Sequence, residues 1–193
     1  MISGFAFELY NETYSTEVNA FIWRGRMPPY LLDGNMDYVA YVGPTVTKCL
    51  DILECLRQRP GIDESQLFFE QDADERFTFT ARLAGNLSIG SLGTVGWINI
   101  RESDDDYGLG IGHAGFKVPD LEVAKYDLLT APVKFEEGLD FEEPYLGIPL
   151  NSHKEIRITE RPLSEIVELR SRRDAIIPIR SDVLSNIHKV GHG

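Results

Sequence analysis

The sequence has no long hydrophobic run, few basic residues and only two cysteines, and each shortage excludes a class of protein. No apolar stretch approaches the roughly 20 residues that a membrane-spanning helix needs. The N-terminus, MISGFAFELYNETYSTE, lacks the basic and apolar regions of a signal peptide. The net charge of −12, from 19 basic and 31 acidic residues, repels nucleic acid. We therefore expect a cytoplasmic protein with neither a membrane nor a nucleic-acid partner.

The two cysteines, Cys49 and Cys55, fall in one predicted helix. Six helical residues rise about 9 Å, which exceeds the roughly 7 Å that a disulfide bridges between Cα atoms. The pair is therefore expected to stay reduced. Neither a CxxC motif nor a Cys/His spacing typical of zinc is present.

What the chain does contain is the composition of a globular protein, with 42% hydrophobic residues over 193 positions. Residues 1–35 are interpreted as an N-terminal extension with a short helix around residues 17–24. Residues 38–42 are β-rich, Pro44 ends that strand, and Thr45 caps a helix with apolar residues at helical spacing. Three or four short strands follow, so residues 36–103 form one predicted unit.

A second unit, residues 107–170, opens in the same way. At an offset of 75 positions, Tyr38 falls on His113, Pro44 on Pro119, and Thr45 on Asp120. The segments PVKFEEGL, PYLGIPL and KEIRITE are again of strand length, and PLSEIVELRS predicts a closing helix. Residues 171–193 are predicted to form a C-terminal tail. Internal repetition of this length indicates a doubled architecture.

These openings resemble those of the vicinal-oxygen-chelate superfamily, which includes glyoxalases, extradiol dioxygenases, epimerases and fosfomycin- or bleomycin-resistance proteins. MDYVAYVGPTVTKCLDIL is similar to the first strand and helix of such a module, where DHVAY followed by a proline is frequent. GHAGFKVPDLEVA is closer still to the usual second opening, and KEIRITERPLSEIVELR resembles the end of small bacterial YecM-type proteins. The resemblance implies an α+β fold: two tandem βαβββ modules in a curled mixed sheet, with helices outside and an N-terminal helical extension.

The resemblance also implies a divalent metal in the cup of the sheet. In the superfamily the first strand of each module usually supplies His, and the last strand usually supplies Glu. His113 stands at one histidine position, whereas Tyr38 stands at the other and is a poor ligand at neutral pH. Glu155 lies near one carboxylate position, although a shift of two residues puts Arg157 there instead. The implied cofactor is one Mn, Fe, Ni, Zn or Co ion held by His113 and Glu155, or none.

Four side chains are candidates for substrate binding on the concave face. Tyr41 and Trp97 offer aromatic surface, and both are also typical of packing residues. Arg82 and Arg157 lie in strand-like segments. If they point outward they pair with the abundant acids, and if they point inward they anchor an anionic ligand, because Arg meets a carboxylate with two parallel hydrogen bonds.

Three functions are compatible with these residues. The first is a glyoxalase-like protein that binds a small oxygen-rich molecule, as a metal-dependent lyase, isomerase or dioxygenase. The second is a non-catalytic, metal-free protein of the same fold that binds or sequesters such a molecule. The third is a metal-free enzyme with His113 as general acid or base beside Tyr38. A small-molecule partner is expected in each case, in a monomer or a homodimer.

Overall fold

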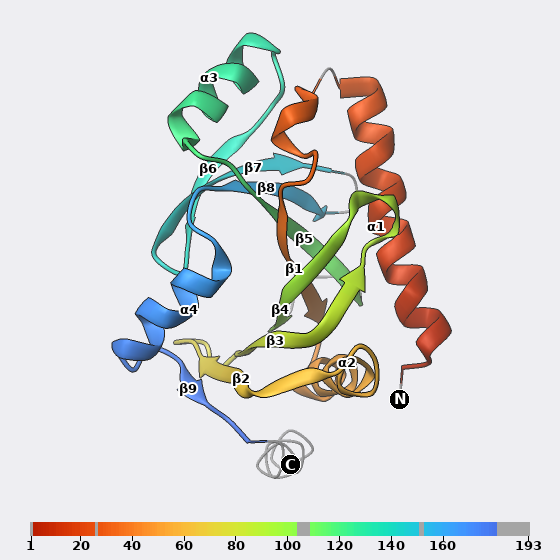
Figure 1. The fold of residues 1–193 in the computed structure, drawn as a ribbon, viewed down its shortest axis with the longest axis vertical. Coiled ribbons are helices and arrows are strands. Elements are labelled where there is room, and N and C mark those ends of the chain that lie inside the picture. Colours follow the sequence, from red (N-terminus) through yellow and green to blue (C-terminus); the bar gives the residue numbers. More distant parts are fainter. Residues whose placement is uncertain (1, 26, 104–108, 151–152, 181–193) are drawn as a thin grey trace.

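A computed structural model describes residues 2–25, 27–103, 109–150 and 153–180. One mixed sheet runs through the molecule (Figure 1), in the strand order β6-β7-β8-β5-β1-β4-β3-β2-β9. Its strands are β1 (Met36–Gly43), β2 (Ile62–Gln71), β3 (Phe77–Ser88), β4 (Thr94–Glu102), β5 (Gly110–Lys117), β6 (Glu136–Asp140), β7 (Glu143–Pro149), β8 (Glu155–Thr159) and β9 (Ile177–Pro178). The helices are α1 (Gly4–Gly25), α2 (Val46–Gln58), α3 (Leu121–Thr130) and α4 (Leu163–Arg172), with short 3-10 turns η1 (Pro29–Leu31) and η2 (Gly90–Leu92).

The pairing repeats outward from the centre of the sheet. In each half the first strand pairs in parallel with the last, as β1 with β4 and β5 with β8. The remaining neighbours within each half are antiparallel, and the halves join through the antiparallel pair β1–β5. This confirms the predicted fold class: two tandem βαβββ modules in a curled mixed sheet. The boundary between modules stays a prediction, because residues 104–108 lie outside the described part.

Local signals explain why each module begins with a strand and a helix. The Thr45 hydroxyl accepts a hydrogen bond from the backbone N–H of Lys48 at 3.2 Å, and α2 begins directly after it. In the second module the Asp120 carboxylate accepts from the N–H groups of Glu122 and Val123 and starts α3. Such side chains satisfy N–H groups that a helix start leaves without partners. The predicted strand, proline and capped helix are confirmed in both modules.

The N-terminal helix is much longer than predicted. It begins at Gly4 rather than near residue 17, because Phe7, Tyr14 and Val18 bury one side of it against the sheet. Tyr14 lies at the centre of this contact. Its hydroxyl accepts the Ala114 N–H at 2.9 Å and donates to the Glu155 carbonyl at 2.8 Å. The extension therefore binds to β5 and β8 of the second module.

The two faces of the sheet are covered differently. Residues of α1, α2 and α3 pack on one face as the larger hydrophobic core. On the other, concave face, Leu163, Ile166 and Val167 of α4 pack against Tyr38 and Phe68. Beyond α4, β9 adds an edge strand to β2, so part of the predicted tail belongs to the sheet. The concave face is therefore not an open cup.

The cysteine prediction is confirmed. Cys49 is buried and Cys55 is half-buried, and both are free thiols. The Cys55 thiol lies 3.1 Å from the Ile2 carbonyl and helps to hold the start of the chain. Within the described ranges, no helix combines the length and apolar character that crossing a membrane requires.

Candidate functional site

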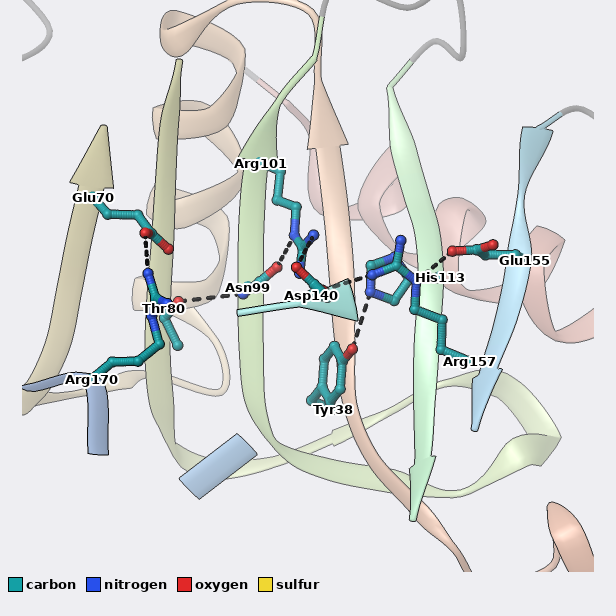
Figure 2. Close-up of polar contacts among 10 residues, drawn as sticks. All are labelled: Tyr38, Glu70, Thr80, Asn99, Arg101, His113, Asp140, Glu155, Arg157 and Arg170. Carbon is teal, nitrogen blue, oxygen red and sulfur yellow. Dashed lines mark hydrogen bonds and ion pairs between the residues drawn. The ribbon is translucent and has the colours of Figure 1, made fainter. Parts of the chain in front are cut away.

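The polar centre of the concave face begins with a contact between the two modules. The Tyr38 hydroxyl, from β1, lies 3.2 Å from Nε2 of His113, from β5, and the ring planes are perpendicular (Figure 2). Both side chains are only 5% exposed. Gly115 makes this contact feasible, because a Cβ there would lie 2.1 Å from the Tyr38 ring. The 75-residue offset therefore does identify two side chains that meet.

Neither member of this pair ionises readily near neutral pH. Burial lowers the pKa of His113 well below 6.5, and the charges of Arg157 and Arg101 lower it further. Burial raises the pKa of Tyr38 to about 12, although Arg101 opposes that shift. The site therefore presents a neutral imidazole and a neutral phenol.

An ion-pair network lies beside them, with Asp140 at its centre. Arg101 donates to both oxygens of this carboxylate, Nη2 to Oδ2 at 2.6 Å and Nη1 to Oδ1 at 3.2 Å. Arg157 Nη1 donates to Oδ2 at 2.7 Å (Figure 2). Burial alone would raise the pKa of Asp140, but the charges of Arg101 and Arg157 and the Arg101 hydrogen bonds outweigh it, so the pKa is lowered. Asp140 is therefore an anion held by two cations.

The two arginines are fixed on their remaining sides as well. Arg101 Nε donates to Asn99, and Arg157 Nε donates to Glu155. The Arg157 guanidinium lies 4.1 Å from the centre of the Tyr145 ring, a cation–π contact. The Arg101 guanidinium makes a similar cation–π contact with Phe141, at 5.0 Å from the centre of the ring.

A second ion pair lies toward the edge of the site. Arg170 of α4 donates to Glu70 of β2 at 2.6 Å, and Asn99 donates to Thr80 at 3.3 Å. Arg170 also faces the Phe141 ring at 5.0 Å. The Arg170–Glu70 pair ties α4 to the first module across the concave face.

The empty space on this face is divided by the tip of the β6–β7 hairpin. A cavity of about 20 Å³ lies between Tyr38, Arg157 and Thr159 and the side chains of Asp140 and Phe141. That volume suffices for about one water molecule. Asp140 and Phe141 also line an open groove of about 370 Å³. The concave face therefore holds a small cavity and a separate groove.

The predicted site residues are only partly brought together. Tyr38, His113, Glu155 and Arg157 converge on the concave face, whereas half-buried Trp97 packs beside the α4 cluster. Tyr41 does not reach this face, which corrects its assignment as a substrate contact. It is buried in the larger core, where its hydroxyl donates to Asn11 of α1 at 2.7 Å.

The remaining polar residues to place are Arg82 of β3, Glu102 of β4 and three residues that the sequence analysis did not single out. Arg82 is exposed and lies opposite Trp97 in the β3–β4 pairing, so its role as an anchor stays a prediction. Glu102, the last residue of β4, accepts a hydrogen bond from the Phe77 N–H at 3.3 Å. Sequence reasoning missed Asn99, Arg101 and Asp140. The first two alternate on β4 and share one face, a signal that was present in WINIRE.

The donor set does not fit a divalent metal. In the register of the sheet, Asn99 of β4 lies opposite Ala40 of β1, and Arg157 of β8 lies opposite Gly115 of β5. Gly115 is the residue equivalent to Ala40 at the 75-residue offset. The equivalent inward positions thus hold Tyr38 and His113 on the first strands, and Asn99 and Arg157 on the last. A guanidinium cannot coordinate a cation and repels it. Among the described residues no group of three or more His, Cys, Asp or Glu could hold a metal. Glu155, the carboxylate predicted to bind a metal together with His113, is not one of these four inward residues.

Comparison with known proteins gives only distant likenesses to solved structures. No family model and no curated protein matches the sequence. A solved methylmalonyl-CoA epimerase from Mycobacterium tuberculosis matches 69% of this chain and 93% of its own, with a TM-score of 0.48 and 16% identity. A mutant 4-hydroxymandelate synthase from Streptomyces coelicolor matches 72% of this chain and 54% of its own, at a TM-score of 0.42 and 15% identity.

A putative dioxygenase from Bacillus subtilis matches 68% of this chain and 42% of its own, with a TM-score of 0.43 and 13% identity. Such distant likenesses carry no argument about activity. The strand order itself defines the class of fold: two βαβββ modules share one mixed sheet, which is the glyoxalase-like arrangement. The assignment of the chain to the YecM-type branch stays a prediction.

The buried neutral imidazole predicts a pH dependence of stability. Below a pH of about 6.5 the unfolded chain protonates His113 but the folded chain does not, so stability is present above that pH and is lost as the pH falls. The loss reaches about 1.4 kcal/mol per pH unit from this one group. We expect urea unfolding between pH 7.5 and 5 to show a shallower pH slope for His113→Gln than for wild type. Identical slopes would contradict the buried neutral state, since the other three histidines are present in both proteins.

Proposed function

We propose that this protein binds a small oxygen-rich molecule on the concave face without a metal. The single observation that carries this proposal is the position of Arg157. It lies on the last strand of the second module, where the resemblance implies a metal-binding carboxylate, and its guanidinium points toward the centre of the site. Arg101 joins it from the first module. A site with two inward cations favours a ligand that carries negative oxygen atoms.

The neighbouring groups suit the same ligand. Guanidinium groups donate in a planar fork that matches carboxylate or phosphate oxygens. A neutral imidazole and a neutral phenol each donate one hydrogen bond and accept another. Tyr38 lines the small cavity and His113 lies behind it in contact with its hydroxyl, so Tyr38 supplies a polar contact to a ligand and His113 orients it.

A metal-free acid–base enzyme is the second candidate, favoured by the direct contact between Tyr38 and His113. The protonation states weigh against it. The pKa of His113 lies well below 6.5 and that of Tyr38 is about 12, whereas a general base works best with a pKa near the working pH. The binding protein is therefore the function that the geometry supports best.

The test is stabilisation by small molecules in the presence of a chelator. Protein treated with EDTA is melted with a panel of neutral polyols, carboxylates and phosphate esters. A ligand that prefers the folded state raises the melting temperature. We expect an anionic class to do so with no added metal, and to lose its effect in Arg157→Gln. Stabilisation that requires added Mn²⁺, Fe²⁺ or Zn²⁺ would overturn the proposal.

A further inference from the structure

We propose that Arg101 and Arg157 form a carboxylate-binding site, and that Asp140 fills this site until the carboxylate of a ligand displaces it. This inference rests on the proposed function and names its ligand class. It also assigns a role to the β6–β7 hairpin, whose tip carries Asp140. The hairpin supplies an internal carboxylate where an external one would bind.

The geometry of the contact is that of carboxylate recognition. Arg101 approaches Asp140 with both terminal nitrogens, and Arg157 adds a third hydrogen bond to Oδ2. The Nε–H of each arginine is directed elsewhere, to Asn99 and to Glu155. Each guanidinium is therefore oriented before any ligand arrives, with its terminal nitrogens aimed at one place. Orientation in advance lowers the entropic cost of binding.

The charges leave room for one anion. With Asp140 in place, the cluster holds two arginines against the two carboxylates of Asp140 and Glu155. Without Asp140 it carries one net positive charge. The side chains of Arg101 and Arg157 are only 21% and 14% exposed, so this charge is poorly solvated and a monoanion would relieve it.

The hairpin that carries Asp140 lies at the edge of the sheet, where contacts of Phe141 with Arg101 and Arg170 add to its strand pairing. β6 is the outermost strand of the sheet and pairs with β7 alone. Its connection to β7 is Phe141 and Glu142, with φ of +52° and +67°, a conformation that favours Asn or Gly over these side chains. Since Asp140 and Phe141 line both the cavity and the groove, their movement would join the two spaces.

An unpaired polar atom marks the space beyond Asp140. The Thr159 hydroxyl is buried, has no hydrogen-bond partner among the described residues, and lines the 20 Å³ cavity next to Arg157. Buried polar groups are nearly always paired with protein or water. Thr159 therefore offers a hydrogen bond to a further oxygen atom of a bound ligand.

The test replaces the internal carboxylate with an external one. Asp140→Ala removes the side chain, so its melting temperature should fall by about 10 °C because two buried arginines lose their anion. Acetate, a mimic of the missing side chain, should restore a large part of this loss in a saturable manner at constant ionic strength. Acetamide, the neutral isostere, should not. The double variant with Arg157→Gln should show no acetate effect.

A second variant covers the case in which Asp140→Ala does not fold. Asp140→Asn keeps the shape of the side chain and removes its charge, so it should bind succinate about tenfold or more tightly than wild type does, because a neutral amide holds the two guanidinium groups less strongly than a carboxylate and is displaced more easily. Equal succinate affinity in the two proteins, or an acetate effect on Asp140→Ala no larger than that of chloride, would overturn the inference. If acetate stabilises Asp140→Ala and wild type also binds a metal that His113→Ala does not, the carboxylate site stands and only the metal-free function is contradicted.

Discussion

Arg157→Gln should lower the free energy of unfolding by about 3 kcal/mol, because removing one member of a buried ion pair leaves its partners in a poorly solvated place. Asp140 keeps its contacts with Arg101, but Glu155 loses the guanidinium that holds it. The Arg157 side chain is 14% exposed, so solvent cannot replace these contacts. Urea unfolding at neutral pH measures the change.

Two further variants separate this effect from a general loss of charge. Arg157→Lys keeps the charge without the planar fork, so we expect a loss of intermediate size. Arg161→Gln removes an arginine whose side chain is 43% exposed and lies 3.5 Å from Glu143, and exposed pairs contribute about 1 kcal/mol or less. Losses of equal size at positions 157 and 161 would show that the network stabilises nothing.

Tyr14→Ala should be at least as damaging, with a loss of about 4 kcal/mol from a fully buried aromatic side chain. The milder Tyr14→Phe isolates the hydroxyl. It removes the hydroxyl that bonds to the Ala114 N–H and to the Glu155 carbonyl, and a buried backbone group that loses its partner costs about 1–3 kcal/mol. Both values come from urea unfolding.

The matched control is Tyr126→Phe, because Tyr126 is 68% exposed on α3. We expect its stability to lie within about 0.5 kcal/mol of wild type. A Tyr14→Phe protein that is equally close to wild type would contradict the role of α1 as a clamp on β5 and β8. In that case the hydroxyl contacts of Tyr14 would add nothing to the attachment of residues 1–35.

The parts of the fold that were predictable are those with strong local signals. Thr45 and Asp120 are side chains that satisfy the first turn of a helix, and a proline precedes each, so both strand-to-helix openings were read at the right place. Their spacing then exposed the duplication. Pairing partners follow from the fold class, not from local sequence, and the resemblance supplied them.

The elements that were missed depend on long-range packing. The first turns of α1 have no favourable pattern, and the helix exists there because Phe7 and Tyr14 are buried against the sheet. The position of α4 over the concave face depends on its contact with Tyr38 and Phe68 across the chain. Neither contact can be inferred from helix periodicity.

The site residues also divide into those with a local sequence signal and those that only long-range packing brings together. Tyr38 and His113 were found because the repeat aligns them, and Arg157 because a strand alternates its faces. The same alternation places Tyr41, three residues after Tyr38, on the opposite face, so its assignment was wrong for a reason already visible in the sequence. Asp140 carried no signal, since only the tertiary position of the hairpin brings it to the arginines.

The most direct measurement is metal retention. Chelator-treated wild type and His113→Ala are incubated with Mn²⁺, Fe²⁺, Co²⁺, Ni²⁺ and Zn²⁺ in turn, passed through a desalting column, and analysed for metal per chain. Because Arg157 and Arg101 face His113, we expect no stoichiometric metal in wild type and the same trace content in the variant. One metal ion per wild-type chain, absent from His113→Ala, would contradict a concave face built for an anion.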